Sequence, residues 1–520
     1  MRRTYPTLLL ATVSLFAMVL ATAGPVVAAD PPTEAVVVRS GNVDTAAALV
    51  MAHGGQVTGE LPLIGAVSAE LAPQAVVALR SLPDLEVAPD VEIRFASAGV
   101  AAPPAPALQR QAMNLPEGWG LESGAGVGVA LVDTGVAAVP QLTGRVVHGP
   151  DLSGEGDGID RYGHGTFMAG LIAAAPVDGD TVGVVGVAPG AHLVSVKVAG
   201  ADGVTSLSRI IEAIGWVVTN QDEHGIRVLN LSVAVTLPLS WQADPLSAAV
   251  QAAWSSGITV VAASGNDGEG TVTSPGRDPW VLTVGASDPN GTPEVVDDTV
   301  ADWSGRGRIG PSHKPDVLAP GVSTISLRVP GSYVDGHHPE GRLGEHHFRG
   351  SGTSMSTALV SGGVALLAEL RPFATPDDLK GAVVATGHPI ADSTAPAVDL
   401  AAADLATPDA AWRQHHPIAF DGLDGRLSQG MPWNHLRAPS PEQAWTRARW
   451  VDEGFARARW VEANLARARW VDANLARARW VEADWSRARW VTTEWADLII
   501  QGGFPDPADI DGPRDGAQAP

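Results

Sequence analysis

Residues 127–135 read Val-Gly-Val-Ala-Leu-Val-Asp-Thr-Gly, a continuous apolar run that ends in a carboxylate and a glycine. The run lacks the alternation of a strand with one wet face, so it predicts a strand buried on both faces of a parallel sheet. Asp133 then lies at the carboxyl end of that strand, where open α/β sheets build their sites. A dinucleotide-binding fingerprint is excluded, because Gly124, Gly126 and Gly128 precede the strand instead of following it.

Four further stretches predict strands of the same kind. Segments 192–198, 228–233, 259–263 and 281–285 are short, apolar and without alternation. Helical patterns separate them, which is typical of a parallel sheet built from βαβ units. We therefore expect residues 126–405 to form an α/β domain, with a mostly parallel central sheet between two helical layers.

Three other polar side chains with groups suited to catalysis lie close to glycines. His164 stands in Gly-His-Gly-Thr at 163–166, at the start of an apolar helical pattern, and Asn266 follows a buried strand in Ser-Gly-Asn-Asp-Gly at 264–268. Ser354 stands in Gly-Thr-Ser-Met-Ser at 352–356, before a second apolar helix; this is not the Gly-x-Ser-x-Gly elbow of α/β-hydrolases. Together with Asp133, these residues supply the groups that acyl transfer needs.

The four motifs, in the order Asp, His, Asn, Ser, resemble those of the subtilisin-like serine peptidase (subtilase) family over about residues 119–405. The resemblance implies a three-layer α/β fold and a serine endopeptidase acting on polypeptides. It implies that Ser354 is the nucleophile, that His164 is the general base and then acid, and that Asp133 orients the imidazole. Asn266 and the Ser354 backbone N–H would form the oxyanion hole. Residues 230–232 (Asn-Leu-Ser) resemble the strand that lines the family's substrate cleft.

The chain departs from the family pattern at three places. Ser-Val-Ala at 232–234 replaces the usual Ser-Leu-Gly, so a methyl group stands on a cleft wall that exposes bare backbone in the family. Phe167 stands where a second histidine is common, and Ser-Thr-Ala at 356–358 replaces Ala-x-Pro. None of these changes alters a residue of the expected site, so we assign residues 102–408 to a subtilisin-like peptidase domain.

The amino-terminal residues predict export. Arg2 and Arg3 precede an apolar run, and small residues at 27–29 end it, which is typical of a cleaved signal peptide over 1–29. A membrane anchor is the alternative, but the run is short for a bilayer. We expect a secreted, extracellular protein without a transmembrane anchor after cleavage. The absence of cysteine excludes disulfides and thiolate chemistry.

Residues 30–101 predict a small α+β module before an Ala/Pro-rich linker. Strands are expected at 35–39, 56–61, 63–71 and 85–95, and helices at 44–53 and 73–82. This βαββαβ order predicts helices on one face of an antiparallel sheet. The module resembles the inhibitory propeptides of subtilases, so we expect it to act as an intramolecular inhibitor that is removed on maturation.

The carboxy-terminal residues follow a different pattern. After a Pro-rich linker at 409–440, residues 441–500 carry a ten-residue repeat around Arg-Ala-Arg-Trp-Val, and 501–520 predict a disordered end. Parts of the repeat weakly resemble pentapeptide-repeat solenoids. A folded module that contacts the cell wall or surface and a flexible stalk with Arg–Trp contacts both remain open.

Charge and composition limit the partners. The formal net charge of −23 disfavours nucleic acid. The chemistry requires no cofactor. The Gly-rich loop with Asp157 and Asp160 is a candidate for structural calcium, and the histidines at 337–338 and 346–347 are a candidate for zinc or pH sensing; a solvated loop is the alternative for both. The rival function is a non-catalytic adhesin in which the repeat tail binds and the peptidase domain is inactive.

Overall fold

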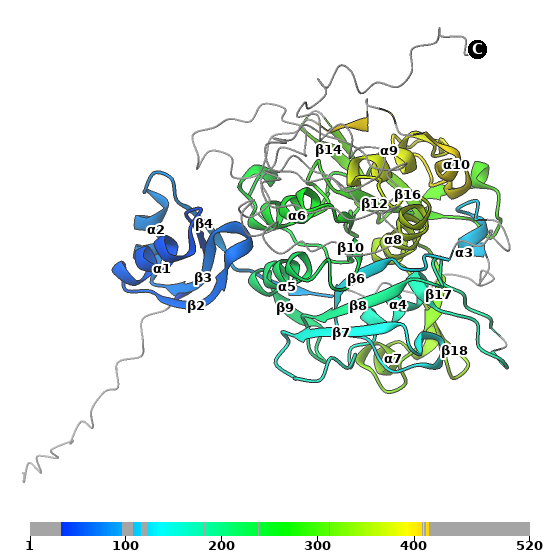
Figure 1. The fold of residues 1–520 in the computed structure, drawn as a ribbon, viewed down its shortest axis with the longest axis horizontal. Coiled ribbons are helices and arrows are strands. Elements are labelled where there is room, and N and C mark those ends of the chain that lie inside the picture. The colour runs from blue at the N-terminus through cyan, green and yellow to red at the C-terminus, as the bar shows by residue number, and fades with distance from the viewer. Residues whose placement is uncertain are drawn as a thin grey trace, which may run out of the picture.

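The computed structural model describes residues 33–95, 108–115 and 123–414, except 181, 238, 311, 408, 410 and 411. The predicted signal peptide, the repeat tail and the predicted disordered end lie outside the described residues, as does most of each predicted linker. Within the described part, a small amino-terminal module stands beside a larger α/β body (Figure 1).

A sheet of eight strands forms the centre of the larger body. Its order is β13-β12-β11-β10-β6-β8-β7, with β16 also paired to β12. The pairs are parallel except β12 with β13. The five predicted strands correspond to β6, β8, β10, β11 and β12. The bounds are β6 Gly128–Asp133, β7 Val146–Asp151, β8 His192–Lys197, β10 Ile226–Leu231, β11 Thr259–Ala263, β12 Leu282–Asp288, β13 Thr299–Val300 and β16 Val317–Pro320.

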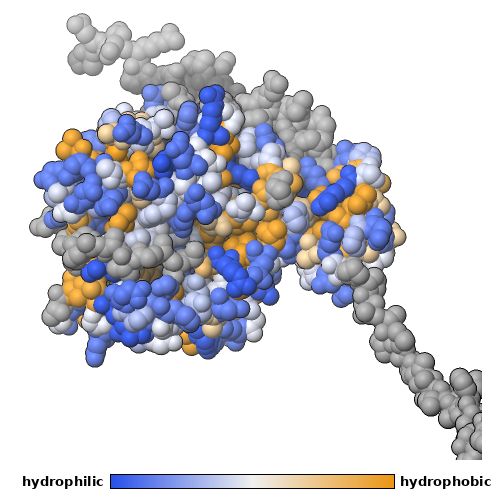
Figure 2. Space-filling model, turned by 180° about the vertical axis from the view of Figure 1, so that it is seen from behind, coloured by the Kyte–Doolittle hydropathy of each residue, from blue (hydrophilic) through white to orange (hydrophobic). Residues whose placement is uncertain are grey.

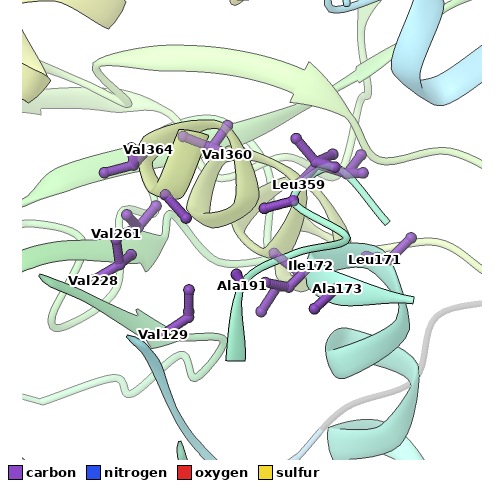
Figure 3. Packing of buried hydrophobic residues seen from close by; sticks show 14 of the residues in the cluster. Val129, Leu171, Ile172, Ala173, Ala191, Val228, Val261, Leu359, Val360 and Val364 are labelled. Carbon is purple, nitrogen blue, oxygen red and sulfur yellow. The ribbon is translucent and has the colours of Figure 1, made fainter. Parts of the chain in front are cut away.

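Helices cover both faces of the sheet, which confirms the predicted three-layer fold. Alternate residues of β6 enter two separate cores: Val129 and Leu131 pack with α4 (His164–Ala173) and α8 (Thr353–Leu370), whereas Ala130 and Val132 pack with α5 (Leu207–Thr219) and α6 (Pro245–Ser255). Figure 3 shows Leu359, Val360 and Val364 of α8 above Val129, Val228 and Val261 of the sheet. Although α8 is long and apolar enough to span a membrane, 89% of it is buried here, so it is a core helix.

Shorter elements complete the body around the sheet. They are α3 Leu108–Gln111, β9 Val204–Ser206, β14 Gly307–Ile309, β15 Ser312–Lys314, β17 Thr324–Leu327, α7 Tyr333–His337, β18 Arg342–Leu343, β19 His347–Gly350, α9 Pro376–Ala385 and α10 Leu400–Leu405.

The amino-terminal module has the predicted element order and its own apolar core. Its antiparallel sheet has the order β2-β3-β1-β4. The bounds are β1 Glu34–Arg39, α1 Val43–Ala52, β2 Gln56–Leu61, β3 Ala66–Leu71, α2 Pro73–Arg80 and β4 Glu86–Pro89. Figure 2 shows the module as a distinct lobe beside the larger body. Leu61 and Ile64 of the module are buried in the same core as α5 and α6, so the two parts share an apolar contact.

Two predicted strands of the module differ from the structure. The strand expected at 63–71 begins only at Ala66, because residues 62–64 form a 3-10 turn that closes at Gly65 with φ +61°. The strand expected at 85–95 divides into β4 and β5 (Glu92–Arg94). β5 leaves the module and pairs antiparallel with β9 of the larger body. The segment predicted as a single strand therefore contributes to two different sheets.

Candidate active site

The expected site residues gather at the carboxyl edge of the central sheet. Asp133 is the last residue of β6, and Asn266 follows β11 by three residues. His164 is the first residue of α4 and Ser354 the second of α8. His164 and Met355, the neighbour of Ser354, line one pocket. Residues more than 200 positions apart thus meet where parallel sheets place their sites.

Asp133 and His164 form a buried pair. The Nδ1 atom of His164 lies 2.8 Å from Oδ1 and 3.0 Å from Oδ2 of Asp133. Both residues are almost fully buried, at 0% and 4% exposure. Because a carboxylate only accepts, the imidazole carries its proton on Nδ1 and leaves Nε2 as the basic nitrogen. Nε2 is buried without a hydrogen-bond partner among the described residues, so it is free to take a proton.

The charge of Asp133 also sets the proton affinity of the ring. Burial by itself lowers the pKa of His164, but the charge and hydrogen bond of Asp133, with a smaller contribution from Asp160, raise the pKa above its ordinary value. The imidazolium that would form after proton transfer is therefore stabilised by a carboxylate already in contact with it.

Ser354 is hydrogen-bonded to Ser232, the residue that follows β10. Its hydroxyl donates to the backbone oxygen of Ser232 at 3.2 Å, and the Ser232 hydroxyl donates to the backbone oxygen of Ser354 at 3.0 Å. Asn230 donates to the Ser232 hydroxyl at 2.9 Å. The hydroxyl of Ser354 is thus bonded to Ser232 and not to His164 in this structure.

The side chain of Asn266 is oriented by the residue before Ser354. Its Oδ1 accepts hydrogen bonds from the backbone N–H and the hydroxyl of Thr353, both at 3.0 Å. With the oxygen engaged, the Nδ2 donors face away from Thr353. Ser354 lies in the first turn of α8, where backbone N–H groups have no partner within the helix. These two kinds of donor are those an oxyanion hole uses.

The loop before His164 is organised by Asp160, a role that the sequence interpretation did not identify. Asp160 is buried, and its two oxygens accept five hydrogen bonds. The donors are Thr134 Oγ1, Tyr162 N, Gly163 N, Thr166 N and Thr166 Oγ1, at 2.7 to 3.1 Å. Both carboxylate oxygens are therefore engaged by protein donors, which ties the Asp133 turn to the start of α4. The two threonines that follow Asp133 and His164 in their motifs are the sequence signal for this hub.

Removal of one acceptor oxygen from Asp160, the hub that binds these five donors, is expected to destabilise the site. Asp160→Asn should lower the free energy of unfolding by about 1–3 kcal/mol, because an amide group would face buried N–H donors. Asp157→Asn is the matched control, since Asp157 is partly exposed and pairs with Arg161 at the surface. Thermal unfolding followed by circular dichroism measures the stability of both variants. An equal, small shift of the unfolding temperature in Asp160→Asn and Asp157→Asn would contradict the role of Asp160.

A residue of the amino-terminal segment lies against the site. Phe95 follows β5, and its ring lies 5.3 Å from the imidazole of His164 between ring centroids, tilted by 52°. Its N–H donates to the oxygen of Gly203 at 3.0 Å, and the hydroxyl of Tyr162 donates to its oxygen at 2.6 Å. Sequence interpretation placed Phe95 at a strand end but gave no signal for this contact.

The histidines of the predicted metal candidate have separate partners. His347 Nε2 lies 2.7 Å from Asp180, His337 Nδ1 lies 2.8 Å from the Tyr333 oxygen, and His338 lies 3.4 Å from Glu340. Within the part of the chain that the structure describes, three or more His, Asp or Glu side chains are nowhere grouped as metal ligands. His338 lines the pocket next to His164, with Phe167 and Phe348.

Known proteins resemble this chain in sequence and fold. The model of the subtilase family matches residues 124–408. The serine protease AprX of Bacillus subtilis (strain 168) is 41% identical over 268 residues, which cover 50% of this chain and 60% of that protein. An alkaline protease of Alkalihalobacillus alcalophilus is 33% identical over 318 residues, 60% of this chain and 71% of that protein. Among solved structures, fervidolysin from Fervidobacterium pennivorans has a TM-score of 0.60 at 24% identity, over 73% of this chain and 62% of that one, a likeness of fold. The chain thus spans less than two thirds of the length of AprX.

Proposed function

Because this chain belongs to the subtilase family, we propose that it is a secreted serine endopeptidase that hydrolyses polypeptides through Ser354, His164 and Asp133. The observation that carries the proposal is the buried Asp133–His164 pair, with the basic Nε2 left without a partner beside the start of α8. An inactive domain has no need to keep a basic nitrogen buried and unpaired, because such a group costs free energy.

The proposed reaction proceeds through an acyl-enzyme. His164 Nε2 takes the proton of the Ser354 hydroxyl as Oγ forms a bond to the peptide carbonyl carbon. The C–N bond then breaks, and the imidazolium returns that proton to the leaving amine. Water, deprotonated by the same nitrogen, releases the acid and restores Ser354. The Asn266 amide and the Ser354 N–H stabilise the oxyanion in both halves of the reaction.

We propose that the segment after the amino-terminal module occupies the substrate position of this site. β5 pairs with β9 in antiparallel register, from Glu92 opposite Ser206 to Arg94 opposite Val204. Ile93 and Phe95 are buried, whereas Arg94 is exposed, the alternation of an extended peptide with one face on a protein. A segment that fills the site blocks other peptides, so the module acts as an inhibitor until the chain is cut shortly after Phe95.

The sequence is the basis for two further proposals, export of the protein and a binding role for the repeat tail. Signal cleavage near residue 29 would release the protein from the membrane, and the arginines and tryptophans of 441–500 would contact a wall polymer or the cell surface. These contacts are chemically separate from acyl transfer. The adhesin alternative keeps the tail function and dispenses with hydrolysis.

Hydrolysis of a short peptide anilide distinguishes a peptidase from a non-catalytic adhesin. The pH dependence of this hydrolysis tests the role of Asp133. The neutral imidazole is the base, so kcat/KM should rise as pH rises through the pKa of His164. Since Asp133 raises that pKa, the acid limb should lie above pH 6.5, roughly the ordinary histidine value.

Asp133→Asn removes the charge and is the comparison variant. It should shift the acid limb to lower pH and reduce the maximal rate, on the order of 10⁴-fold for loss of such an aspartate. An unchanged acid limb in Asp133→Asn would contradict the assignment. An adhesin would release no anilide at any pH.

A further inference from the structure

We infer that Tyr162 is a substrate-positioning residue: its hydroxyl donates a hydrogen bond to the carbonyl oxygen of the peptide residue whose side chain lies against the His164 ring. The inference rests on the proposed function, in which the β5 segment stands in for a bound peptide. In the structure that residue is Phe95, and the distance from Tyr162 Oη to its oxygen is 2.6 Å.

The polar groups of one peptide residue are both held by the larger body. The N–H of Phe95 donates to Gly203 O at 3.0 Å, and its C=O accepts from Tyr162. The first contact continues the β5–β9 ladder, which any extended peptide can make with its backbone. The second comes from a side chain beyond the ladder, so it fixes the peptide at the point where it leaves β9 and passes His164.

Tyr162 is itself held rigidly. Its ring stacks on Tyr333 with centroids 5.2 Å apart and planes 11° apart, and Tyr333 stacks on His337 at 3.9 Å. Its backbone N–H donates to Asp160 at 3.1 Å. A side chain fixed by stacking and by a buried carboxylate loses little entropy when it binds, which suits a positioning role.

Gly203 provides the room for this arrangement. Its φ is +69°, and a Cβ atom placed there would lie 2.4 Å from Cε2 of Tyr162. The backbone of Gly203 therefore approaches the face of Tyr162 as no other residue could, while its oxygen binds the Phe95 N–H. The tyrosine, the glycine and the peptide form one close-packed contact.

The hydroxyl is suited to be a permanent donor. Burial, together with nearby negative groups, raises the pKa of Tyr162 to about 12, so the proton stays on oxygen at neutral and mildly alkaline pH. Because Tyr162 is two residues before His164, the same loop sets the positions of the substrate carbonyl and of the base. A bound peptide is thereby aligned with the imidazole.

The first test needs no catalysis. In the full-length Ser354→Ala protein, hydrogen–deuterium exchange of fragments covering residues 92–95 reports how firmly the segment is held. Tyr162→Phe should speed that exchange about 3- to 10-fold. Tyr333→Phe should not, because it keeps the stacked ring and removes a hydroxyl that makes no hydrogen bond to the described residues 92–95. Equal exchange in Tyr162→Phe and the parent protein would overturn the inference.

The second test isolates the carbonyl in a substrate. The anilide of the chain's own 93–96 sequence, Ile-Arg-Phe-Ala, is compared with the same peptide carrying a thioamide, a weaker acceptor, at the Phe carbonyl. Tyr162→Phe should lower kcat/KM about 5- to 10-fold for the oxo peptide and less than 2-fold for the thio peptide. Equal losses for both peptides would show that Tyr162 acts only on the fold. If wild type cleaves neither peptide, the proposed function fails, and the exchange experiment alone decides the role of Tyr162.

Discussion

Ser354→Ala is expected to lower kcat for peptide hydrolysis on the order of 10⁶-fold, the magnitude known for the nucleophile of subtilisin, with little change in peptide binding. The hydroxyl is the side-chain oxygen that bonds to the peptide carbonyl carbon, so its removal leaves His164 without the group it activates. His164→Ala should cause a similar loss, and the double variant should be no worse than either single one, because base and nucleophile act as a unit. Steady-state hydrolysis of a peptide anilide, normalised to folded protein, measures the loss.

Ser256→Ala is the matched control for this loss. Ser256 caps the end of α6, and its hydroxyl bonds to Ala253 O, at the opposite edge of the sheet from Asn266. It should retain wild-type turnover. The turnover of Asn266→Ala should lie between those of Ser354→Ala and Ser256→Ala. The expected loss is on the order of 10²- to 10³-fold, as for the oxyanion-hole asparagine of subtilisin. Near-normal turnover in Ser354→Ala would remove Ser354 from the reaction.

Ser354→Ala is also expected to keep its amino-terminal module, whereas the wild-type chain loses it during maturation. Because Phe95 lies against His164, we expect Ser354 of the same molecule to cut a bond after it. Intact mass and amino-terminal sequencing of the purified proteins should therefore show the 33–95 module in the variant and a mature terminus shortly after Phe95 in the wild type.

The rate of this maturation distinguishes self-cleavage from cleavage by another enzyme. Cleavage within one chain is first order, so its half-time should not change when the protein is diluted tenfold. Asn266→Ala should mature slowly, in parallel with its lower turnover. If Ser354→Ala and wild type reach the same terminus without added protease, the module is removed by another route.

Much of the fold was predictable because the decisive strands are buried on both faces. Val129 and Leu131 face one core and Ala130 and Val132 the other, so the sequence shows a continuous apolar run and not an alternation. The polar residues that end such strands were correctly placed at one sheet edge for the same reason. Glycines next to His164 and Asn266 marked where the backbone turns sharply.

Contacts between distant segments were not predictable from local pattern. Phe95 and His164 are brought together by β5 pairing with β9, and the strand-like pattern at 85–95 does not indicate that its last part joins another sheet. Likewise, the five donors around Asp160 come from two separate segments, Thr134 and residues 162–166, so local pattern does not indicate that they share one acceptor. The orientation of the Ser354 hydroxyl toward Ser232 depends on β10 and α8 together.

Labelling of the mature protein with a fluorophosphonate tests whether Ser354 is a nucleophile activated by His164. The reagent forms a P–O bond only to a hydroxyl activated by a base and releases fluoride, so it reports the Ser354–His164 unit without any assumption about the substrate. We expect one adduct per chain by intact mass, mapped to Ser354 in the peptide that contains Thr353 and Met355, and none in His164→Ala. A folded, mature protein that remains unlabelled, or that carries the adduct on a different serine, would contradict this expectation.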